Sequence, residues 1–379
     1  MSKRKSILFV TGTRADFGKL EPLAVAAVEA QHDVSFFVTG MHMLPFFGLT
    51  KIEVHRVPGV SVVEFLNQRE GDPQDTIFAK TVIGLSDYLQ VNEHHLVVVH
   101  GDRVEALAAA VVCATNYVRC AHIEGGEVSG TIDELFRHCN TKLSSFHLVS
   151  SNDARRRVLS MGESEDRIYI IGSPELDTHS RPSGVSLDAV KDRYAIPFAE
   201  YGIVIFHPVT SEVSNMERQA TALFDALFDS GRNFVVINPN NDPGCEHILS
   251  VINKLPSDRF RVLPSMRFAH FSELLRNAAV MVGNSSAGVR EAPFLGLPSL
   301  DIGTRQQNRY TSESVYIASP HDRALILGFL KQNWGRRFHP QSEFGHGCSA
   351  ENFVRVLSEP EFWSKPLQKY FSESQKHST

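Results

Sequence analysis

The sequence predicts an α/β protein made of two doubly wound domains, each a parallel sheet with helices on both faces. Three observations lead to this prediction. Apolar runs alternate with helical stretches along the chain. The runs are continuously apolar, which is typical of strands that are buried on both faces. The pattern stops and restarts near residue 200, and a length of 379 residues is more than one ordinary domain needs.

The expected elements follow one another in a regular order. In the first half we expect strands at 6–12, 34–40, 95–102, 119–126, 146–151 and 167–174, with helices around 18–30, 72–91, 103–117, 131–145 and 152–162. The stretch 173–197 carries prolines and charges, and we expect it to be a linker. In the second half we expect strands at 202–208, 233–239, 260–266, 279–286, 299–305 and 315–319, with helices near 212–230, 244–254, 268–277, 287–296, 321–333 and 348–358.

This order divides the chain into three parts. Residues 1–178 form the predicted N-terminal domain and residues 198–355 the predicted C-terminal domain. Residues 356–379 form a tail, for which packing back onto the first domain is one option. A cleft between two such domains is where small-molecule sites are most often found, so we expect the active site there.

Composition narrows the class of protein. The chain is 42% hydrophobic and 21% charged, as in globular proteins, and its net charge of −5 argues against nucleic acid as a partner. The five cysteines include no CxxC pair, so we expect reduced thiols in a cytoplasmic protein and no zinc site. The first apolar run is too short for a signal peptide, and no run approaches the roughly 18 apolar residues of a membrane helix.

The stretch 119–146 holds the densest group of chemistry-bearing residues. A strand breaks at Gly125-Gly126, with Glu124 at its end, and the next helix has Asp133 and Glu134 in its first turn. The carboxyl ends of parallel strands are where α/β sheets build sites, so Glu124 favours a function. Asp133 and Glu134 fit a function and a simple interaction with the helix dipole equally well. The expected apolar stripe of this helix consists of Ile132, Leu135, Phe136 and Leu143.

Two further strand ends in the first half carry polar motifs. TGTRADFGKLEP (11–22) places Arg14 at the start of a helix, which suits a phosphate or another anion, while Asp16 is explained equally well as a helix cap. The motif is not GxGxxG, so the dinucleotide fingerprint is absent. HGDRVEA (100–106) places Asp102 and Arg103 directly after a buried strand, where polar groups are costly unless they are paired.

Three strand ends in the second half are also polar. FHPVTSE (206–212) presents His207, which could equally be structural. GNSSAGVREAP (283–293) combines two glycines with Ser285 and Ser286, and its backbone N–H groups suit a pyrophosphate, with Glu291 placed to bind ribose hydroxyls. The alternative is an ordinary serine cap with Glu291 on the helix surface. DIGTRQQNR (301–309) adds Arg305 and Arg309, which either neutralise an anion or are solvated.

Together these strings resemble the hydrolysing UDP-N-acetylglucosamine 2-epimerases of sialic acid biosynthesis. The resemblance covers residues 6 to about 320 and rests on TGTRADFGKL, TGMHM (39–43), GDRVEA, HIEGGEVSGTIDE..RH (122–138), GNSSAG..E and IGTRQ..R. It implies two Rossmann-like domains of the GT-B type. The non-hydrolysing bacterial epimerases share the fold, but their HVEAGLRT string is replaced here by HIEGGEVSG, which favours the hydrolysing branch.

The resemblance also implies roles for individual residues. The acid–base positions are Glu124, Asp102, Asp133 and Glu134, and the cleft histidine is His207. The substrate-binding positions are Arg14 and Arg103 for the phosphates, Ser285, Ser286 and Glu291 for uridine diphosphate, and Arg305 and His42. Gly18 departs from the serine that some relatives have. No metal and no cofactor are expected, and relatives form homodimers or homotetramers.

The implied reaction converts UDP-N-acetylglucosamine and water to N-acetylmannosamine and UDP through a 2-acetamidoglucal, a step that supplies sialic acid for capsule polysaccharide. The alternatives are the same reaction on a UDP-2,4-diacetamido-2,4,6-trideoxy-hexose, as in legionaminic acid pathways, and a non-hydrolysing epimerase. A retaining glycosyltransferase and a nucleotide-sugar sensor without turnover are more distant alternatives. The acid cluster favours an enzyme over a sensor, because a sensor needs no acid–base groups.

Overall fold

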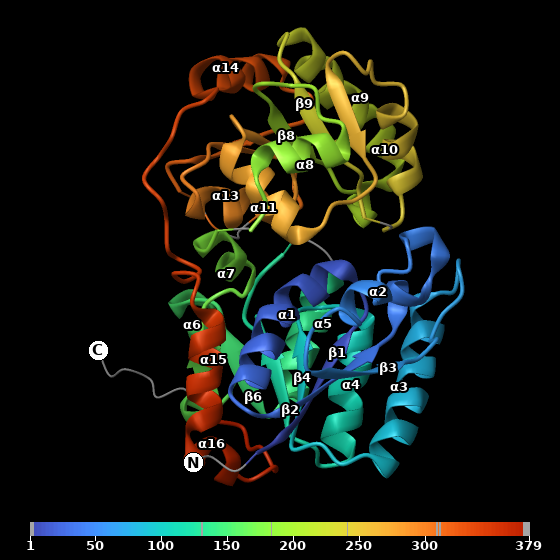
Figure 1. Cartoon of the computed structure of the whole chain (residues 1–379), viewed down its shortest axis with the longest axis vertical. Helices are drawn as coiled ribbons and strands as arrows, with labels where there is room; N and C mark the ends of the chain where they lie inside the picture. The colour runs from blue at the N-terminus through green and yellow to red at the C-terminus, as the bar shows by residue number, and fades with distance from the viewer. Residues whose placement is uncertain are drawn as a thin grey trace. The chain divides into compact units, whose positions relative to one another are not determined.

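The computed structural model of the chain describes residues 4–129, 132–182, 184–240, 242–307, 310 and 312–373. They form two compact units. Unit 1 consists of Met1–Glu127, Ile132–Asp177 and Phe344–Thr379, and unit 2 of Val128–Thr131 and Thr178–Glu343. Each unit is built on its own parallel sheet (Figure 1). The predicted α/β fold with two doubly wound domains is confirmed.

The sheet of unit 1 has seven strands in the order β3-β2-β1-β4-β5-β6-β7, and every pairing between neighbours is parallel. The strands are β1 (Ser6–Thr11), β2 (Asp33–Val38), β3 (Val60–Glu64), β4 (Leu96–His100), β5 (Cys120–Ile123), β6 (Phe146–Val149) and β7 (Ile168–Ile170). The edge strand β3 was not predicted. None of its residues is fully buried, and it lacks the continuous buried apolar run that marks the inner strands.

The helices of unit 1 cover both faces of this sheet. They are α1 (Arg14–Glu29), α2 (Lys51–Val54), α3 (Gln74–Val91), α4 (Val104–Thr115), α5 (Ile132–Leu143), α6 (Asn152–Ser160), α15 (Ser349–Ser358) and α16 (Pro360–Ser364), together with short 3-10 turns at Gly40–Met43, Pro45–Phe47 and Glu165–Arg167. Ile7 and Phe9 pack toward α1 and α15, whereas Leu8 and Val10 pack toward α3 and α4. Alternate residues of one strand thus build two cores, which explains the continuous apolar runs.

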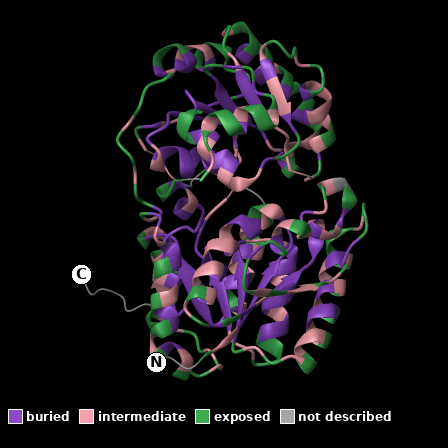
Figure 2. Ribbon diagram, in the orientation of Figure 1, coloured by how far each residue is buried: buried purple, intermediate pink, exposed green. Residues whose placement is uncertain are grey.

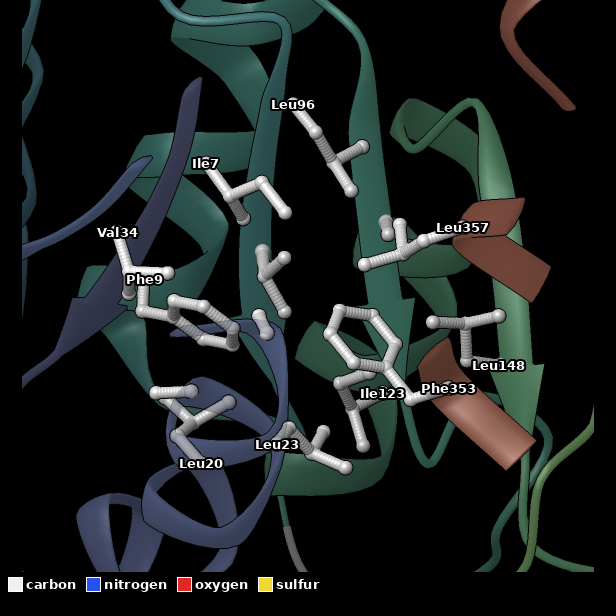
Figure 3. Packing of buried hydrophobic residues seen from close by; sticks show 14 of the residues in the cluster. Ile7, Phe9, Leu20, Leu23, Val34, Leu96, Ile123, Leu148, Phe353 and Leu357 are labelled. Carbon is white, nitrogen blue, oxygen red and sulfur yellow. The ribbon is translucent and has the colours of Figure 1, made fainter. Parts of the chain in front are cut away.

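The end of the chain belongs to the core of unit 1. Figure 3 shows Phe353 and Leu357 of α15 pointing at the strand residues Phe9 and Ile123. Phe362 of α16 is fully buried, and its ring stacks on Phe146 with 4.2 Å between centroids. The assignment of residues up to 355 to the second domain therefore differs from the structure, since these apolar side chains are buried against the first sheet.

The sheet of unit 2 has six parallel strands in the order β10-β9-β8-β11-β12-β13. They are β8 (Gly202–Ile205), β9 (Phe234–Ile237), β10 (Phe260–Leu263), β11 (Met281–Gly283), β12 (Ser299–Ile302) and β13 (Val315–Ala318). One face is covered by α9 (Met216–Asp229), α10 (Cys245–Ile252) and α14 (Arg323–Asn333), and the other by α8 (Leu187–Tyr194) and α11 (Phe268–Asn277). A 3-10 turn at Thr210–Asn215 precedes α9.

Two predictions about the helices were wrong. The expected linker 173–197 holds two helices, α7 (Glu175–Ser180) and α8, and the boundary between the units falls inside α7. The expected helix 287–296 is broken into α12 (Ser286–Val289) and α13 (Glu291–Phe294). Pro293 explains this break, because it has no N–H to donate to the preceding turn.

The topology places a switch point in each sheet. Strand order reverses between β1 and β4 in unit 1, and between β8 and β11 in unit 2. Ligands of open α/β sheets bind at the carboxyl ends of the strands at such a point. Figure 2 shows that these central strands are buried, apart from Ser6 at the start of β1, which is partly buried. Among the described residues, no helix is long and apolar enough to cross a membrane.

Candidate active site

The carboxyl end of β5 places Glu124 in an unusual backbone conformation. Its φ is 62°, in the left-handed region that non-glycine residues rarely adopt. Its N–H donates to the carbonyl of Leu148 (3.0 Å), and only 4% of the residue is exposed. Backbone strain of this kind costs about 1–3 kcal/mol and is typical of functional sites.

The Glu124 carboxylate is surrounded by hydrogen-bond donors of unit 1. Its Oε2 lies 3.2 Å from Lys19 Nζ and 3.2 Å from His100 Nε2, and its Oε1 accepts from the Ser173 hydroxyl. Lys19 Nζ also lies 2.7 Å from Glu175 Oε2, so one ammonium group serves two buried carboxylates. A buried charge needs such partners to offset its lost hydration.

Asp102, at the carboxyl end of β4, is held by helix α5. Arg137 of α5 donates to the Asp102 carboxylate and, over 3.2 Å, to the carbonyl of Glu127. The carbonyl of Gly101 accepts from Asn140 Nδ2 (3.0 Å) and lies 2.7 Å from His122 Nε2. Burial lowers the pKa of His122 to about 3, so its ring is neutral and Nε2–H is the donor. The loop that carries Asp102 is therefore fixed by α5, through Arg137 and Asn140, and by His122 of β5.

The buried face of α5 is polar, and this corrects the expected apolar stripe. Arg137, Asn140 and Thr141 are buried, while Ile132 and Leu135 are 47% and 55% exposed. The helix is oriented by its hydrogen bonds with the β4 end instead of by apolar packing.

Asp133 and Glu134 lie in the first turn of α5, and both are half-buried. Glu134 Oε1 lies 3.4 Å from His138 Nε2, one turn further along the helix. The preceding Gly130 and Thr131 of the motif lie outside the described residues. The contacts of this turn are compatible with both the functional and the helix-dipole interpretation.

The two predicted phosphate arginines of unit 1 have protein partners. Arg14 donates from Nε and Nη2 to Glu53 (3.0 and 2.5 Å), which fixes its guanidinium at the start of α1. Arg103 Nε lies 3.8 Å from Glu105 Oε2. The capping explanation of Asp16 is confirmed, since Thr13 and Asp16 form a reciprocal capping box.

Glu105 is a buried acid that sequence reasoning missed. It is 2% exposed, and its carboxyl packs against Gly12 and Gly40; a Cβ at Gly12 would lie 3.0 Å from the Glu105 carboxyl carbon, and a Cβ at Gly40 would collide with the Gly12 carbonyl at 2.5 Å. Burial raises the pKa of Glu105, and the charge of Asp16 acts in the same direction. The Glu105 carboxyl therefore packs against the turn that follows β1.

His42 has a structural environment. It is fully buried, with Nε2 3.0 Å from the Thr11 hydroxyl and Nδ1 2.6 Å from the Thr50 hydroxyl. Both ring nitrogens are engaged, and burial lowers the pKa of His42. These contacts fix the ring beside the turn that follows β1, and its expected contact with substrate stays a prediction.

In unit 2, Asn284 ties together the two strands at the switch point. Its Oδ1 accepts from the N–H of His207 (2.6 Å), and its Nδ2 donates to the His207 carbonyl (2.8 Å). Gly283, with φ 132°, lies so close to β8 that a Cβ there would collide with the carbonyl of Ile205. The glycine thus brings the β11 end against the β8 end.

The His207 ring has a defined tautomer. Its Nδ1 accepts a hydrogen bond from the N–H of Asn240 (3.0 Å), which leaves the proton on Nε2. Burial, and to a lesser degree the charge of Arg305, lowers the pKa of His207 well below its usual value. The half-buried ring is therefore a neutral N–H donor in the physiological range.

The GNSSAG turn is partly as predicted. Ser285 caps α12 by accepting from the N–H of Ala287 (3.4 Å), and Ser285 and Ser286 are half-buried. Because α12 has only one turn, the dipole of the expected longer helix is not available, and the backbone N–H groups remain as donors. Arg305 Nη1 donates to the carbonyl of Asn284 (3.3 Å), which keeps its charge next to this turn. Arg309 lies outside the described residues.

Glu291 is not on the helix surface, so that alternative is wrong. It is 4% exposed, and its Oε1 lies 2.8 Å from His179 Nε2. His179 comes from α7, inside the segment that was expected to be a linker.

Several partners of the site were missed. Lys19 belongs to the TGTRADFGKLEP motif, but the motif did not indicate its role, while Ser173 and Glu175 belong to the supposed linker. His100 was visible as the last residue of its strand, directly before Gly101. In the part of the chain that the structure describes, no three histidines, cysteines or acids are grouped to hold a metal ion.

Comparison with known proteins identifies the family. The family model described as UDP-N-acetylglucosamine 2-epimerase matches residues 26–358. A UDP-N-acetylglucosamine 2-epimerase of Neisseria meningitidis is 44% identical over 97% of this chain and 98% of its own. A UDP-N,N'-diacetylbacillosamine 2-epimerase (hydrolyzing) of Legionella pneumophila is 29% identical over 96% of this chain and 98% of its own.

The fold of a solved relative is also similar. The structure of UDP-GlcNAc 2-epimerase from Methanocaldococcus jannaschii, in complex with UDP-GlcNAc and UDP, superposes with a TM-score of 0.79. The alignment covers 93% of this chain and 99% of that one, at 18% identity. The family match and the Neisseria relative extend over almost the whole sequence, and the chain belongs to the UDP-N-acetylglucosamine 2-epimerase family.

Proposed function

We propose that the protein is a hydrolysing UDP-N-acetylglucosamine 2-epimerase, which converts UDP-N-acetylglucosamine and water to N-acetylmannosamine and UDP. The observation that carries the proposal is the buried, strained Glu124 carboxylate with its three donors, in a HIEGGEVSG string that replaces the HVEAGLRT string of non-hydrolysing enzymes. By the same resemblance, the enzyme works in the cytoplasm as a homodimer or homotetramer and supplies sialic acid for capsule polysaccharide.

The proposed chemistry begins with an elimination. The C2–H of the sugar becomes acidic only as the C1–O bond to UDP breaks and positive charge develops at C1. Glu124 takes the C2 proton, the electron pair forms the C1=C2 double bond of a 2-acetamidoglucal, and UDP leaves with the electrons of the C1–O bond. Lys19, His100 and Ser173 hold the carboxylate in place for this step.

The second step is an addition of water to the double bond. Water adds at C1 while a proton is delivered to C2 on the opposite face, which gives N-acetylmannosamine. Two faces require a second acid–base group, and Asp102, Asp133 and Glu134 are the candidates. Asp102 is the best oriented of the three, because Arg137 holds its carboxylate.

The groups of unit 2 are proposed to bind the leaving group. Backbone N–H groups of the turn at Ser285 and Ser286, the charge of Arg305 and the neutral N–H donor of His207 stabilise the diphosphate as its charge grows. Arg14 and Arg103 are the further phosphate ligands that the resemblance implies. Glu291 binds the ribose hydroxyls.

One alternative substrate has a specific observation behind it. The Legionella relative, 29% identical, is named a hydrolyzing 2-epimerase of UDP-N,N'-diacetylbacillosamine. The same acid–base groups suit a 2,4-diacetamido-trideoxy sugar, because both substrates carry the N-acetyl group at C2. The 44% identity to the Neisseria UDP-N-acetylglucosamine 2-epimerase favours the simpler sugar.

The test is a proton NMR time course with UDP-N-acetylglucosamine in deuterated water. Free UDP together with N-acetylmannosamine deuterated at C2 is the expected result. UDP-N-acetylmannosamine without free UDP would instead assign the protein to the non-hydrolysing branch. No change with this sugar, followed by UDP release from the diacetamido sugar, would replace the substrate and keep the reaction.

A further inference from the structure

A chain of three buried side chains in unit 2 ends on Glu291. His179 Nε2 lies 2.8 Å from Glu291 Oε1, and His179 Nδ1 lies 2.8 Å from the Ser272 hydroxyl. The three residues come from α13, α7 and α11, and their exposed fractions are 4%, 1% and 1%. Ionisable and hydroxyl groups at this depth need an explanation, since burying them costs free energy unless each is satisfied.

The donor and acceptor in each of these two hydrogen bonds follow from the chemistry of Glu291, His179 and Ser272. A carboxylate only accepts hydrogen bonds, so the proton on His179 Nε2 points at Glu291. The Ser272 hydroxyl then donates to Nδ1, and this fixes the tautomer of the ring. The carbonyl of His179 accepts from Arg276 Nη2 (2.6 Å), and the ring lies edge-on to Phe268 at 5.5 Å. Arg276 thus fixes the backbone of His179, and Phe268 packs against its ring.

The set resembles a nucleophilic Ser-His-acid triad in composition only. A triad needs an accessible hydroxyl that a substrate can reach. Ser272 is 1% exposed, so no substrate atom reaches it, and the three-residue series ends on the Glu291 carboxylate. The series Ser272–His179–Glu291 therefore holds a carboxylate in place and does not perform nucleophilic catalysis.

We propose that His179 is a positioning residue for nucleotide recognition: its Nε2–H holds one oxygen of Glu291, so that the carboxylate is oriented toward the ribose hydroxyls of UDP. This inference rests on the proposed function. The backbone around Glu291 explains why another side chain has to orient its carboxylate. Arg290, before Glu291, breaks the helical path between α12 and α13 with φ −120° and ψ −60°, so no continuous helix fixes the direction of Glu291.

The role assigns a function to α7. Its first residue, Glu175, pairs with Lys19 in unit 1, and its fifth, His179, holds Glu291 in unit 2. The six-residue helix thus contacts, at its first residue, the ammonium group that also pairs with Glu124 and, at its fifth, the Glu291 carboxylate.

The test compares the affinities of UDP and 2′-deoxy-UDP by isothermal titration calorimetry. An oriented carboxylate discriminates against a ligand that lacks a ribose hydroxyl, and a hydrogen bond with a charged partner corresponds to about tenfold or more. The wild-type protein is expected to bind UDP at least about tenfold more tightly. In His179→Leu this ratio should fall to near one, with KM raised and kcat changed much less.

A matched control lies on α11. His270 is also buried in unit 2, and its Nδ1 lies 3.0 Å from the Tyr194 hydroxyl. His270→Leu should keep the ratio, because the hydrogen bond that it removes is with Tyr194 and not with Glu291. His179→Gln, whose amide N–H can replace Nε2–H, should restore part of the ratio, and it serves if His179→Leu does not fold.

The other outcomes separate two failures. If wild type discriminates and both His179 variants discriminate equally well, the positioning role is wrong. If wild type binds UDP but not in preference to 2′-deoxy-UDP, the ribose contact is wrong and the inference falls, while UDP release still decides the proposed function. If wild type binds neither ligand, the proposed function falls too.

Discussion

Lys19 Nζ lies 3.2 Å from Glu124 Oε2 and forms part of the environment of the candidate C2 base. The same ammonium group lies 2.7 Å from Glu175, and the three side chains are 17%, 5% and 2% exposed. Two carboxylates at this depth repel each other unless a cation lies between them. Lys19 therefore has an electrostatic role that its position inside a helix does not reveal.

Replacing Lys19 with methionine should destabilise the protein by about 3 kcal/mol, because breaking a buried ion pair leaves a charge without compensation. Adding Glu175→Gln to this variant should recover part of the loss. Urea unfolding of the two single variants and the double variant measures the coupling. Lys51→Met is the control, since its pair with Glu64 is more exposed and should contribute less than about 1 kcal/mol. Additive effects of Lys19→Met and Glu175→Gln would contradict the shared-cation model.

Glu124→Gln should abolish UDP release and preserve UDP binding. The amide keeps the size of the side chain and removes the base, so kcat should fall at least about 10²-fold. The matched control is Glu127→Gln, since Glu127 is also 4% exposed and its carboxylate accepts from the Ser150 hydroxyl. A coupled assay for free UDP measures turnover, and calorimetry measures binding. Equal loss in both variants would argue that burial, and not base chemistry, makes Glu124 important, and a sensor would release no UDP in any form.

The left-handed backbone of Glu124 predicts an order of stability among inactive variants. Glycine adopts a φ of 62° without strain, whereas alanine does not. Glu124→Gly should therefore be more stable than Glu124→Ala by about 1 kcal/mol, although glycine normally destabilises. Thermal unfolding of the two proteins, neither of which has the carboxylate, isolates the backbone term. Ala121, in the middle of β5, is the control position. There the ordinary order should hold, and Ala121→Gly should be less stable than the wild-type protein.

The architecture was largely predictable because it depends on the period of apolar residues. The inner strands of both sheets are marked by continuous apolar runs, such as Leu96–His100 in β4. The edge strand β3 was missed because it pairs with one neighbour only and none of its residues is fully buried. Helices α7 and α8 were missed because Pro174 and Pro182 near them suggested a linker, and short helices are stabilised by packing that a sequence pattern does not contain.

Site residues that directly follow a strand were predictable from the sequence. The helix residues that form hydrogen bonds or ion pairs with them were not. Asp102 and His207 follow β4 and β8, which lie at the switch points of their own sheets, and Glu124 follows β5, the neighbour of β4. Lys19 and His179 reach their carboxylates over long sequence separations, 105 and 112 residues, and no local pattern indicates such pairing. His42 is fully buried between two threonines, a setting that the family motif did not indicate, and its contact with substrate stays a prediction.

Glu163 should make the protein sensitive to acid. Burial opposes its charge, but its bond with His147 (2.9 Å) and the charges of Lys369 and Lys142 outweigh this and lower the pKa of Glu163 to about 2. A depressed carboxyl pKa stabilises the fold above about pH 4.5, and the contribution is lost as the pH falls toward 2. Glu163→Gln should cost about 1–3 kcal/mol at pH 7, after discounting for solvent screening, and progressively less below pH 4.5. Denaturant unfolding across this range measures it, and a constant difference would contradict the linkage.

Glu105 should show the opposite sign. Burial raises its pKa above the usual 4.5, so the unfolded chain loses this proton at a lower pH than the folded protein does. The contribution of Glu105 to stability is then fully present below pH 4.5 and is lost as the pH rises through the folded pKa. Glu105→Gln, which is neutral at every pH, should therefore unfold at a higher temperature than wild type at pH 8 and not at pH 4. Glu163→Gln provides the comparison, because its deficit should be largest at pH 8. If both variants changed in the same direction with pH, a general effect of losing negative charge would explain them better than the burial of Glu105 against Gly12 and Gly40.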